Sequence, residues 1–191
     1  MIARENPFAS HRVLRIRYRP QDVTWKRLLE RLAALDYRAA IVGPQGSGKT
    51  TLLEDLGARL AANGFYIAAL RLDDRTPFFT RRFLDDFFRH VDERTVILLD
   101  GADRMGRLCW WRFRRRTTRA AGLIVATHRA GMLPTLLRCR TDERLLREIV
   151  DELLSPSDDI DEPIVKQLFD RHGGNVRDAL RELYDLYAVG A

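Results

Sequence analysis

The sequence predicts an α/β fold, in which helices cover a parallel sheet, followed by a small all-helical part. Two observations support this prediction. Short apolar runs alternate with helical patterns up to about residue 140, and only helical patterns follow. The chain has 191 residues, which is enough for one substantial core with a small appendage. We therefore expect residues 1–140 to form an α/β core and residues 141–191 a helical lid.

The predicted strands are short and mainly apolar, as strands covered on both faces of a parallel sheet are. Four runs are clear and one is weaker. The clear runs are residues 39–42, 65–72, 96–99 and 123–126, and the weaker run is 133–137.

The predicted helices show apolar residues that recur at three- and four-residue spacing. In the first part they span residues 25–35, 49–62, 78–91 and 103–119. In the second part they span residues 142–154, 161–171 and 176–187. Thr141 is expected to cap the first of these last three, and the Pro, Ser and Asp content of residues 155–159 predicts a loop.

The composition is that of a globular protein, with 46% apolar and 31% charged residues. No stretch approaches the roughly 20 apolar residues of a membrane helix, and the N-terminus has no apolar run of signal-peptide length. We therefore expect a cytoplasmic protein with no membrane partner. Cys109 and Cys139 lack the spacing of a zinc site and are expected to be reduced core residues.

The segment GPQGSGKT, residues 43–50, matches the P-loop pattern G-x-x-x-x-G-K-[S/T] between a predicted strand and a predicted helix. Its glycines let backbone N–H groups turn toward phosphates, and the helix N-terminus adds its positive dipole end. Lys49 is expected to reach the β- and γ-phosphates of ATP, and Thr50 to ligate Mg²⁺. The α/β core is thus expected to be a P-loop NTPase three-layer sandwich. The predicted cofactor-binding residues are Gly43, Gln45, Gly46, Ser47, Gly48, Lys49, Thr50 and Thr51.

Asp100 ends the apolar run VILLD about fifty residues after Lys49, where a Walker B aspartate would hold Mg²⁺. The predicted strand 65–72 lies between the P-loop helix and Asp100, which fits ATPases whose sheet has an additional strand. A GTPase is disfavoured because the N-K-x-D guanine signature is missing.

Gly101 follows Asp100, where many ATPases carry a glutamate that activates water. Two substitutes lie nearby in the sequence. Asp103 is expected at the start of the next helix, which it can also cap. His128, just after the fourth predicted strand, can orient water. The identity of the base therefore stays open, and we expect slow turnover.

The segment GGNVR, residues 173–177, contains helix-boundary signals. Asn175 is expected to cap the last helix, and Asp178 then stands at its third position, where a negative charge suits the dipole. Arg177 does not suit the first turn, which indicates either an anionic partner such as a phosphate or a solvated arginine. The apolar stripe of this helix is expected to be core: Val176, Leu180, Leu183, Tyr184 and Tyr187.

Together, the P-loop, residues 96–100, Thr127 and residues 173–177 resemble the AAA+ and STAND superfamily of P-loop ATPases, over roughly residues 12–188. The resemblance implies that Thr127 senses the γ-phosphate and that Arg177 contacts it from the lid. It also implies that the segment around RYRP, residues 17–20, covers the adenine. The segment 129–136 is too short for the usual helix that carries a trans-acting arginine finger, and Arg129 is a candidate to stand in for that finger.

The segment 104–119 carries seven arginines and three aromatic residues. Arginine interleaved with tryptophan suits nucleic acid, through phosphate contacts and stacking. The helical spacing predicts that Met105, Leu108, Cys109 and Phe113 bury one face, leaving the arginines on the other. That surface is expected to bind either nucleic acid or a partner protein, or to be an ordinary solvated surface.

We therefore expect an ATP-binding, slow or partner-stimulated ATPase that acts as a nucleotide-dependent switch. The alternatives are a nucleic-acid-binding ATPase adaptor and, less favoured, a P-loop kinase that phosphorylates a small molecule. A kinase would need an arginine-rich lid after the fourth strand, where only the short segment 129–140 exists. The predicted catalytic residues are Lys49, Asp103, Thr127, His128 and Arg177, and the predicted metal ligands are Thr50 and Asp100.

Overall fold

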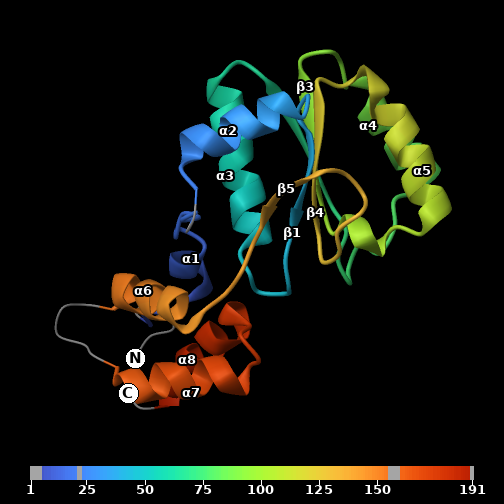
Figure 1. The fold of residues 1–191 in the computed structure, drawn as a ribbon. Helices are drawn as coiled ribbons and strands as arrows, with labels where there is room; N and C mark the ends of the chain where they lie inside the picture. The colour runs from blue at the N-terminus through green and yellow to red at the C-terminus, as the bar shows by residue number, and fades with distance from the viewer. Residues whose placement is uncertain (1–5, 21–22, 155–159, 190–191) are drawn as a thin grey trace. The chain divides into compact units, whose positions relative to one another are not determined.

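The computed structural model describes residues 6–20, 23–154 and 160–189 (Figure 1). The chain groups into two compact units. One, the helical unit, comprises Met1–Arg17, Pro44–Gly48 and Cys139–Ala191; the other, the sheet unit, comprises Tyr18–Gly43 and Lys49–Arg138. The loop predicted at residues 155–159 lies outside the described residues, and the proposed domain division at residue 140 stays a prediction.

The sheet unit contains a five-stranded parallel sheet with the order β2-β3-β4-β1-β5. The predicted strands are confirmed, with ends that shift by one or two residues. They are β1 (Arg38–Val42), β2 (Tyr66–Arg71), β3 (Thr95–Asp100), β4 (Gly122–Thr127) and β5 (Thr135–Arg138). Because β4 lies between β1 and β3, the strand that ends in Asp100 does not adjoin the strand that leads into the P-loop.

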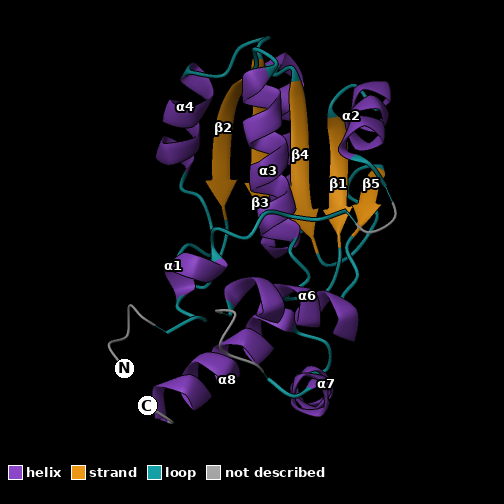
Figure 2. Cartoon of the chain, turned by 90° about the vertical axis from the view of Figure 1, so that its left-hand side faces the viewer, coloured by secondary structure: helices purple, strands orange, loops and turns teal. Residues whose placement is uncertain are grey.

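Helices cover both faces of this sheet, which gives the predicted three-layer α/β sandwich. The helices α2 (Trp25–Ala34) and α3 (Lys49–Ala62) lie on one face (Figures 1 and 2), and α4 (Arg81–Arg89) and α5 (Arg107–Arg116) lie on the other (Figure 1). The central strands are buried accordingly: every residue of β4 is buried, as are five of the six in β3. This burial explains why these strands read as uninterrupted apolar runs.

The helix predicted at residues 103–119 is divided into three pieces. A 3-10 helix, η1 (Ala102–Arg104), comes first, and another, η2 (Thr117–Arg119), follows α5. Extended backbone at Met105 and Gly106 separates η1 from α5 and resets the helical phase.

The predicted buried face of this segment is therefore partly wrong. Leu108 is 59% exposed and Cys109 is also exposed, whereas Phe113 is buried. Trp110 packs on the core beside Phe113, with ring centroids 6.3 Å apart. Because α5 begins at Arg107, the residues that face the core are Trp110, Phe113 and Thr117, which follow one another at three- and four-residue spacing.

The helical unit contains the short helix α1 (Ser10–Val13) and three longer ones, α6 (Glu143–Leu153), α7 (Glu162–Arg171) and α8 (Val176–Val189). Their core includes the predicted stripe of α8, with Val176, Leu180 and Leu183 buried. The N-terminal segment joins this core: Phe8 is 3% exposed and packs against Tyr187 at 5.2 Å between ring centroids.

Asp142, and not the predicted Thr141, caps α6, because its carboxylate accepts the N–H of Leu145 at 2.7 Å. In the described ranges of the chain, no helix has both the length and the apolar character needed to cross a membrane.

Candidate active site

The P-loop residues Pro44–Gly48 adopt a conformation that only glycine permits at two positions. Gly46 and Gly48 have φ angles of +75° and +77°, in the left-handed region that is strained for other residues. A Cβ on Gly46 would also overlap the side-chain amide of Asn175 and come 3.3 Å from the backbone nitrogen of Arg177. The loop is closed by Ser47, whose hydroxyl donates to the carbonyl of Pro44 at 2.8 Å. Gly46 thus lies against the start of α8.

The start of α8 has the predicted cap. The Asn175 side-chain oxygen accepts the N–H of Asp178 at 3.3 Å, and its amide nitrogen donates to the Asp178 carboxylate at 2.6 Å. Asp178 stands at the third helical position, as expected. Arg177 is an exposed residue in this first turn, so the unfavourable placement of a cation near the positive dipole end is real.

The two predicted magnesium ligands lie within one hydrogen bond of each other. Thr50, in the first turn of α3, donates its hydroxyl to the carboxylate of Asp100 at 2.9 Å. Asp100 ends β3 and is 17% exposed, and Lys49 beside Thr50 is buried. A hydroxyl and a carboxylate are oxygen donors of the kind that Mg²⁺ prefers.

No group of three or more His, Cys, Asp or Glu side chains suited to a metal ion occurs among the residues that the structure describes. A magnesium ion at Thr50 and Asp100 would therefore keep several waters or take oxygens from phosphates, which is how Mg²⁺ is commonly bound. These two residues fit such an ion.

Arg71 is a neighbour of Asp100 that sequence reasoning missed. It ends β2, and the parallel register pairs it with Asp100. Its Nε atom lies 3.7 Å from an Asp100 carboxylate oxygen and 3.8 Å from one of Asp73. A signal existed in the sequence, because Arg71 lies near the end of the second apolar run and Asp100 ends the third. Neighbouring parallel strands bring such ends to the same edge of the sheet.

Gly101 has a backbone reason to be glycine. Its φ is +77°, and a Cβ there would overlap the carbonyl oxygen of Leu72. The N–H of Leu72 donates to the Asp100 carbonyl at 2.9 Å, so the backbone hydrogen bonding between β2 and β3 continues one residue beyond β2, up to this turn. A glutamate cannot occupy position 101 without moving the backbone.

Asp103 and His128, considered separately from the sequence, form a pair. A carboxylate oxygen of Asp103 lies 2.8 Å from His128 Nδ1, and the other accepts the His128 backbone N–H at 3.4 Å. Asp103 belongs to η1 and does not cap α5, which Gly106 precedes. That part of the prediction is wrong, because the chain turns at Gly101 and forms a separate 3-10 turn before α5.

The pKa of Asp103 reflects this pairing. Partial burial raises its pKa, but hydrogen bonds from the His128 side chain and from backbone N–H groups, together with the charge of His128, outweigh burial. The pKa therefore lies below the ordinary value of 3.8, and Asp103 is a carboxylate at neutral pH. The Asp103 and His128 side chains are 26% and 45% exposed, so water reaches both.

Thr127 ends β4 and is fully buried. Its hydroxyl donates to the Arg129 carbonyl at 3.1 Å, and its carbonyl accepts the N–H of Gly43 at 3.2 Å. Register pairing of Val42 with Thr127 thus brings the proposed sensor beside the first residue of the P-loop motif. The roles of Thr127, Arg129 and Arg177 stay predictions.

The segment 17–20, assigned by resemblance to the adenine, is anchored to α3. The backbone N–H of Tyr18 donates to the carboxylate of Asp55 at 2.7 Å, and Asp55 is only 6% exposed. This contact fixes Tyr18 at the flank of the helix that follows the P-loop. Its role toward adenine stays a prediction.

Solved structures with a similar fold share little sequence with this chain. One is a mutant of RuvB from Thermotoga maritima, with 17% identity, a TM-score of 0.58, and coverage of 88% of this chain and 65% of that one. Another is AMPPCP-bound DnaA from Aquifex aeolicus, with 17% identity and a TM-score of 0.56. The similarity covers 85% of this chain and 60% of that DnaA chain. A structure of DnaA bound to AMPPCP and single-stranded DNA gives 18% identity, a TM-score of 0.57, and coverage of 83% and 57%.

This chain therefore spans about three fifths of the length of these structures, which support the fold. No curated protein matches the sequence. A family model does match: residues 39–149 fit the ATPase family associated with various cellular activities (AAA), a range that holds β2 to β5, all of β1 except Arg38, and also Lys49, Asp100 and the Asp103–His128 pair. Because that match covers more than half of the chain, this protein belongs to the AAA family of ATPases.

Proposed function

We propose that this chain is a cytoplasmic nucleotide-dependent switch, which binds magnesium ATP and hydrolyses it slowly or when a partner stimulates it. The observation that carries the proposal is the hydrogen bond between Thr50 and Asp100 directly after a P-loop lysine. This hydrogen bond joins the two residues that we expect to bind magnesium, at the carboxyl end of β3. The solved DnaA structures with bound AMPPCP, which is an ATP analogue, are further support.

Lys49, Thr50 and Asp100 would bind the triphosphate and its metal. Lys49 carries a positive charge for the β- and γ-phosphate oxygens, and the Thr50 and Asp100 oxygens hold the ion. When bound, Mg²⁺ neutralises the charge that develops on the phosphate oxygens. The P-loop glycines let backbone N–H groups face those oxygens, where a side chain would obstruct them.

The Asp103–His128 pair would supply the base that activates water, because position 101 is a glycine and not the usual glutamate. The Asp103 carboxylate accepts the hydrogen on His128 Nδ1 at 2.8 Å, which in the neutral imidazole leaves Nε2 as the acceptor. An imidazole held in this way can take a proton from the attacking water, with the carboxylate stabilising the charge that results. We infer that His128 is the base and Asp103 its positioning residue.

Thr127 and Arg177 would report the state of the γ-phosphate. Thr127 is buried at the end of β4, and Arg177 carries an exposed guanidinium in the first turn of α8. In this proposal, contacts of both residues with the γ-phosphate are lost on hydrolysis, so the lid responds to the nucleotide. That loss is the switching event.

Isothermal titration tests the nucleotide site most directly. Magnesium ATP should bind the wild-type chain, and Lys49→Ala should abolish binding, because the phosphates then lose their buried positive partner. Lys26→Ala is the matched control, since Lys26 is an exposed lysine on α2 and its loss should leave affinity unchanged. Equal affinity of the wild type and Lys49→Ala would show that the nucleotide site is assigned wrongly.

A further inference from the structure

The stretch of sequence that contains α5 carries positive charge without any negative charge. From Arg104 to Thr141 the sequence contains ten arginines and no aspartate or glutamate. Protein surfaces usually mix the two signs of charge. This stretch therefore stands out even in an arginine-rich chain.

Among the residues that the structure describes, some arginines of η1, α5 and η2 pair with a carboxylate, and the others do not. Arg116 pairs with Asp85 at 2.7 Å and lies over the ring of Phe88 at 4.5 Å, and Arg104 pairs with Asp74 at 2.9 Å. These two join neighbouring elements. Within the described residues, the other arginines of α5 and η2 have no carboxylate within ion-pair distance, and all are exposed: Arg107, Arg112, Arg114, Arg115 and Arg119.

The positions of these exposed arginines lower the stability of α5 taken by itself. Arg107 occupies the first helical position, near the positive dipole end, where a cation is unfavourable. Arg112 and Arg115, and again Arg115 and Arg119, follow at three- and four-residue spacing, where like charges repel. A polyanion laid along α5 would relieve both effects.

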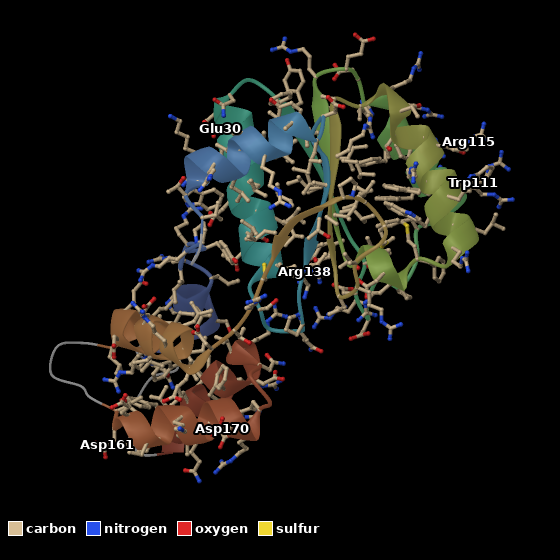
Figure 3. The ribbon with its side chains drawn as sticks, viewed as in Figure 1. Glu30, Trp111, Arg115, Arg138, Asp161 and Asp170 are labelled. Atoms are coloured by element: carbon tan, nitrogen blue, oxygen red, sulfur yellow. The ribbon has the colours of Figure 1, made fainter. Side chains whose placement is uncertain are left out.

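An exposed tryptophan lies among these arginines. Trp111 is 52% exposed, while its neighbour Trp110 packs on the core. The guanidinium of Arg115 lies 4.8 Å from the Trp111 ring centroid, and both side chains point away from the sheet on the outer side of α5 (Figure 3). The ring thus contacts a cation and is still half exposed, as a side chain that stacks on a flat aromatic ligand would be.

We propose that the outer face of α5, defined by Arg107, Trp111, Arg112, Arg115 and Arg119, binds single-stranded nucleic acid. Guanidinium groups bind phosphates with paired hydrogen bonds, and exposed tryptophans stack on bases. Arg107 and Arg119 are twelve residues apart, a path of about 18 Å at the helical rise per residue, which is long enough for several phosphates of one strand. A single strand is favoured over a duplex because only unpaired bases offer their faces for stacking.

This site is separate from the nucleotide site, and its test uses the full 191-residue chain. Fluorescence anisotropy would compare labelled single-stranded DNA, single-stranded RNA of the same sequence, and duplex DNA over a range of salt concentrations. We expect at least one single strand to bind more tightly than the duplex, with affinity that falls as salt rises. The DNA and RNA arms identify which strand the surface prefers.

Two sets of variants locate the surface. Trp111→Ala should weaken single-strand binding by about five- to a hundredfold, as expected for the loss of one stacked base. The double variant Arg112→Ala with Arg115→Ala should weaken it and lower the slope of log affinity against log salt by about 1.4. The matched control is Lys26→Ala with Arg27→Ala, which removes the same charge from two exposed residues of α2 and should leave the affinity unchanged.

Three outcomes would overturn the proposal. The first is that neither single strand binds the wild type at low salt. The second is that the α2 control weakens binding as much as the α5 double variant, since binding would then follow net charge alone. The third is that poly-glutamate displaces the strand while Trp111→Ala has no effect, which would identify an acidic protein as the partner. Lys49→Ala should leave single-strand binding intact, so failure here is distinct from failure of the nucleotide site.

Discussion

Two parts of the candidate active site reach their geometry by different routes. The P-loop, residues 43–50, is contiguous in sequence, and its Gly46 and Gly48 adopt left-handed backbone. The strand-end cluster comprises Arg71, Asp100, Asp103, Thr127 and His128 and comes from the ends of three strands. Its internal contacts join residues about 25 to 30 positions apart, as between Asp103 and His128.

The difference teaches which kind of site residue a sequence reveals. A P-loop carries its own geometry, because glycine, lysine and threonine at fixed spacing act within one turn and one helix start. The strand-end cluster depends on the order and register of β2, β3 and β4. A shift of register would separate Arg71 from Asp100 while leaving the P-loop intact.

The largest expected effect tests whether the strand-end cluster takes part in chemistry. His128→Ala should lower single-turnover hydrolysis by about 10²- to 10⁴-fold, since general-base assistance is typically worth that much. Asp103→Asn should act in the same direction, because the amide no longer holds the Nδ1 hydrogen. Affinity for ATP should change little in either variant.

His90→Ala is the control for this experiment, since His90 is an exposed histidine at the end of α4. If the wild type turns over rapidly and neither substitution slows it, the pair is only structural. The base would then have to come from a partner chain.

A smaller effect is expected at the P-loop and lid. Arg177→Ala should weaken ATP binding by about tenfold or more and ADP binding much less, because the proposed contact is to the γ-phosphate alone. A charge-assisted hydrogen bond of this kind is worth about 1.5 to 3 kcal/mol. Arg181→Ala, one turn further along α8 and also exposed, should affect neither nucleotide. Equal losses for ATP and ADP would contradict the sensor assignment.

The turn at Gly101 tests how rigidly the strand-end cluster is built. Gly101 and Gly64 both have positive φ, +77° and +89°, but only Gly101 faces a backbone carbonyl, because nothing lies within 4 Å of a Cβ at Gly64. Gly64→Ala should therefore lower the free energy of unfolding by about 1 kcal/mol, from backbone strain alone. Gly101→Ala should lower it by about 1 to 3 kcal/mol more, through the overlap with Leu72.

Urea denaturation of the two variants measures this difference. If both variants lost the same free energy of unfolding, the backbone at Gly101 would be able to move away from the new side chain at little cost. In that event Gly101→Glu would be a usable gain-of-function test, whereas the present geometry predicts that it misfolds the turn.

The smallest effect concerns the pH dependence of stability. Because the pKa of Asp103 is lower when folded than its ordinary value of 3.8, ionised Asp103 stabilises the fold above that value. This contribution is lost as pH falls through the lower folded pKa. Thermal unfolding of the wild type and Asp103→Asn, measured from neutral pH to below 3.8, should therefore show a higher melting temperature for the wild type. This difference in melting temperature should shrink at the acidic end of the range. If the difference in melting temperature stayed unchanged at acidic pH, the stabilising contact between Asp103 and His128 would not depend on the charge of Asp103.

The amino-acid sequence by itself determined the type and chain order of the strands and of the longer helices, the P-loop and the aspartate that ends β3. It also determined the cap of α8, because Asn175 and Asp178 meet within one turn. All of these depend on periodicity or on spacing of a few residues. Such interactions are local, so they persist whichever elements pack around them.

Only the tertiary structure decided that Asp103 meets His128, that Arg71 reaches toward Asp100 and that Leu72 excludes a side chain at position 101. It also decided which tryptophan packs on the core, since the extended backbone between η1 and α5 changed the helical phase, so that the partly buried Trp110 faces the core and Trp111 is exposed. The physical reason is common to all of these. Each contact depends on strand register or helix phase, and one residue of shift in either points a side chain in a different direction.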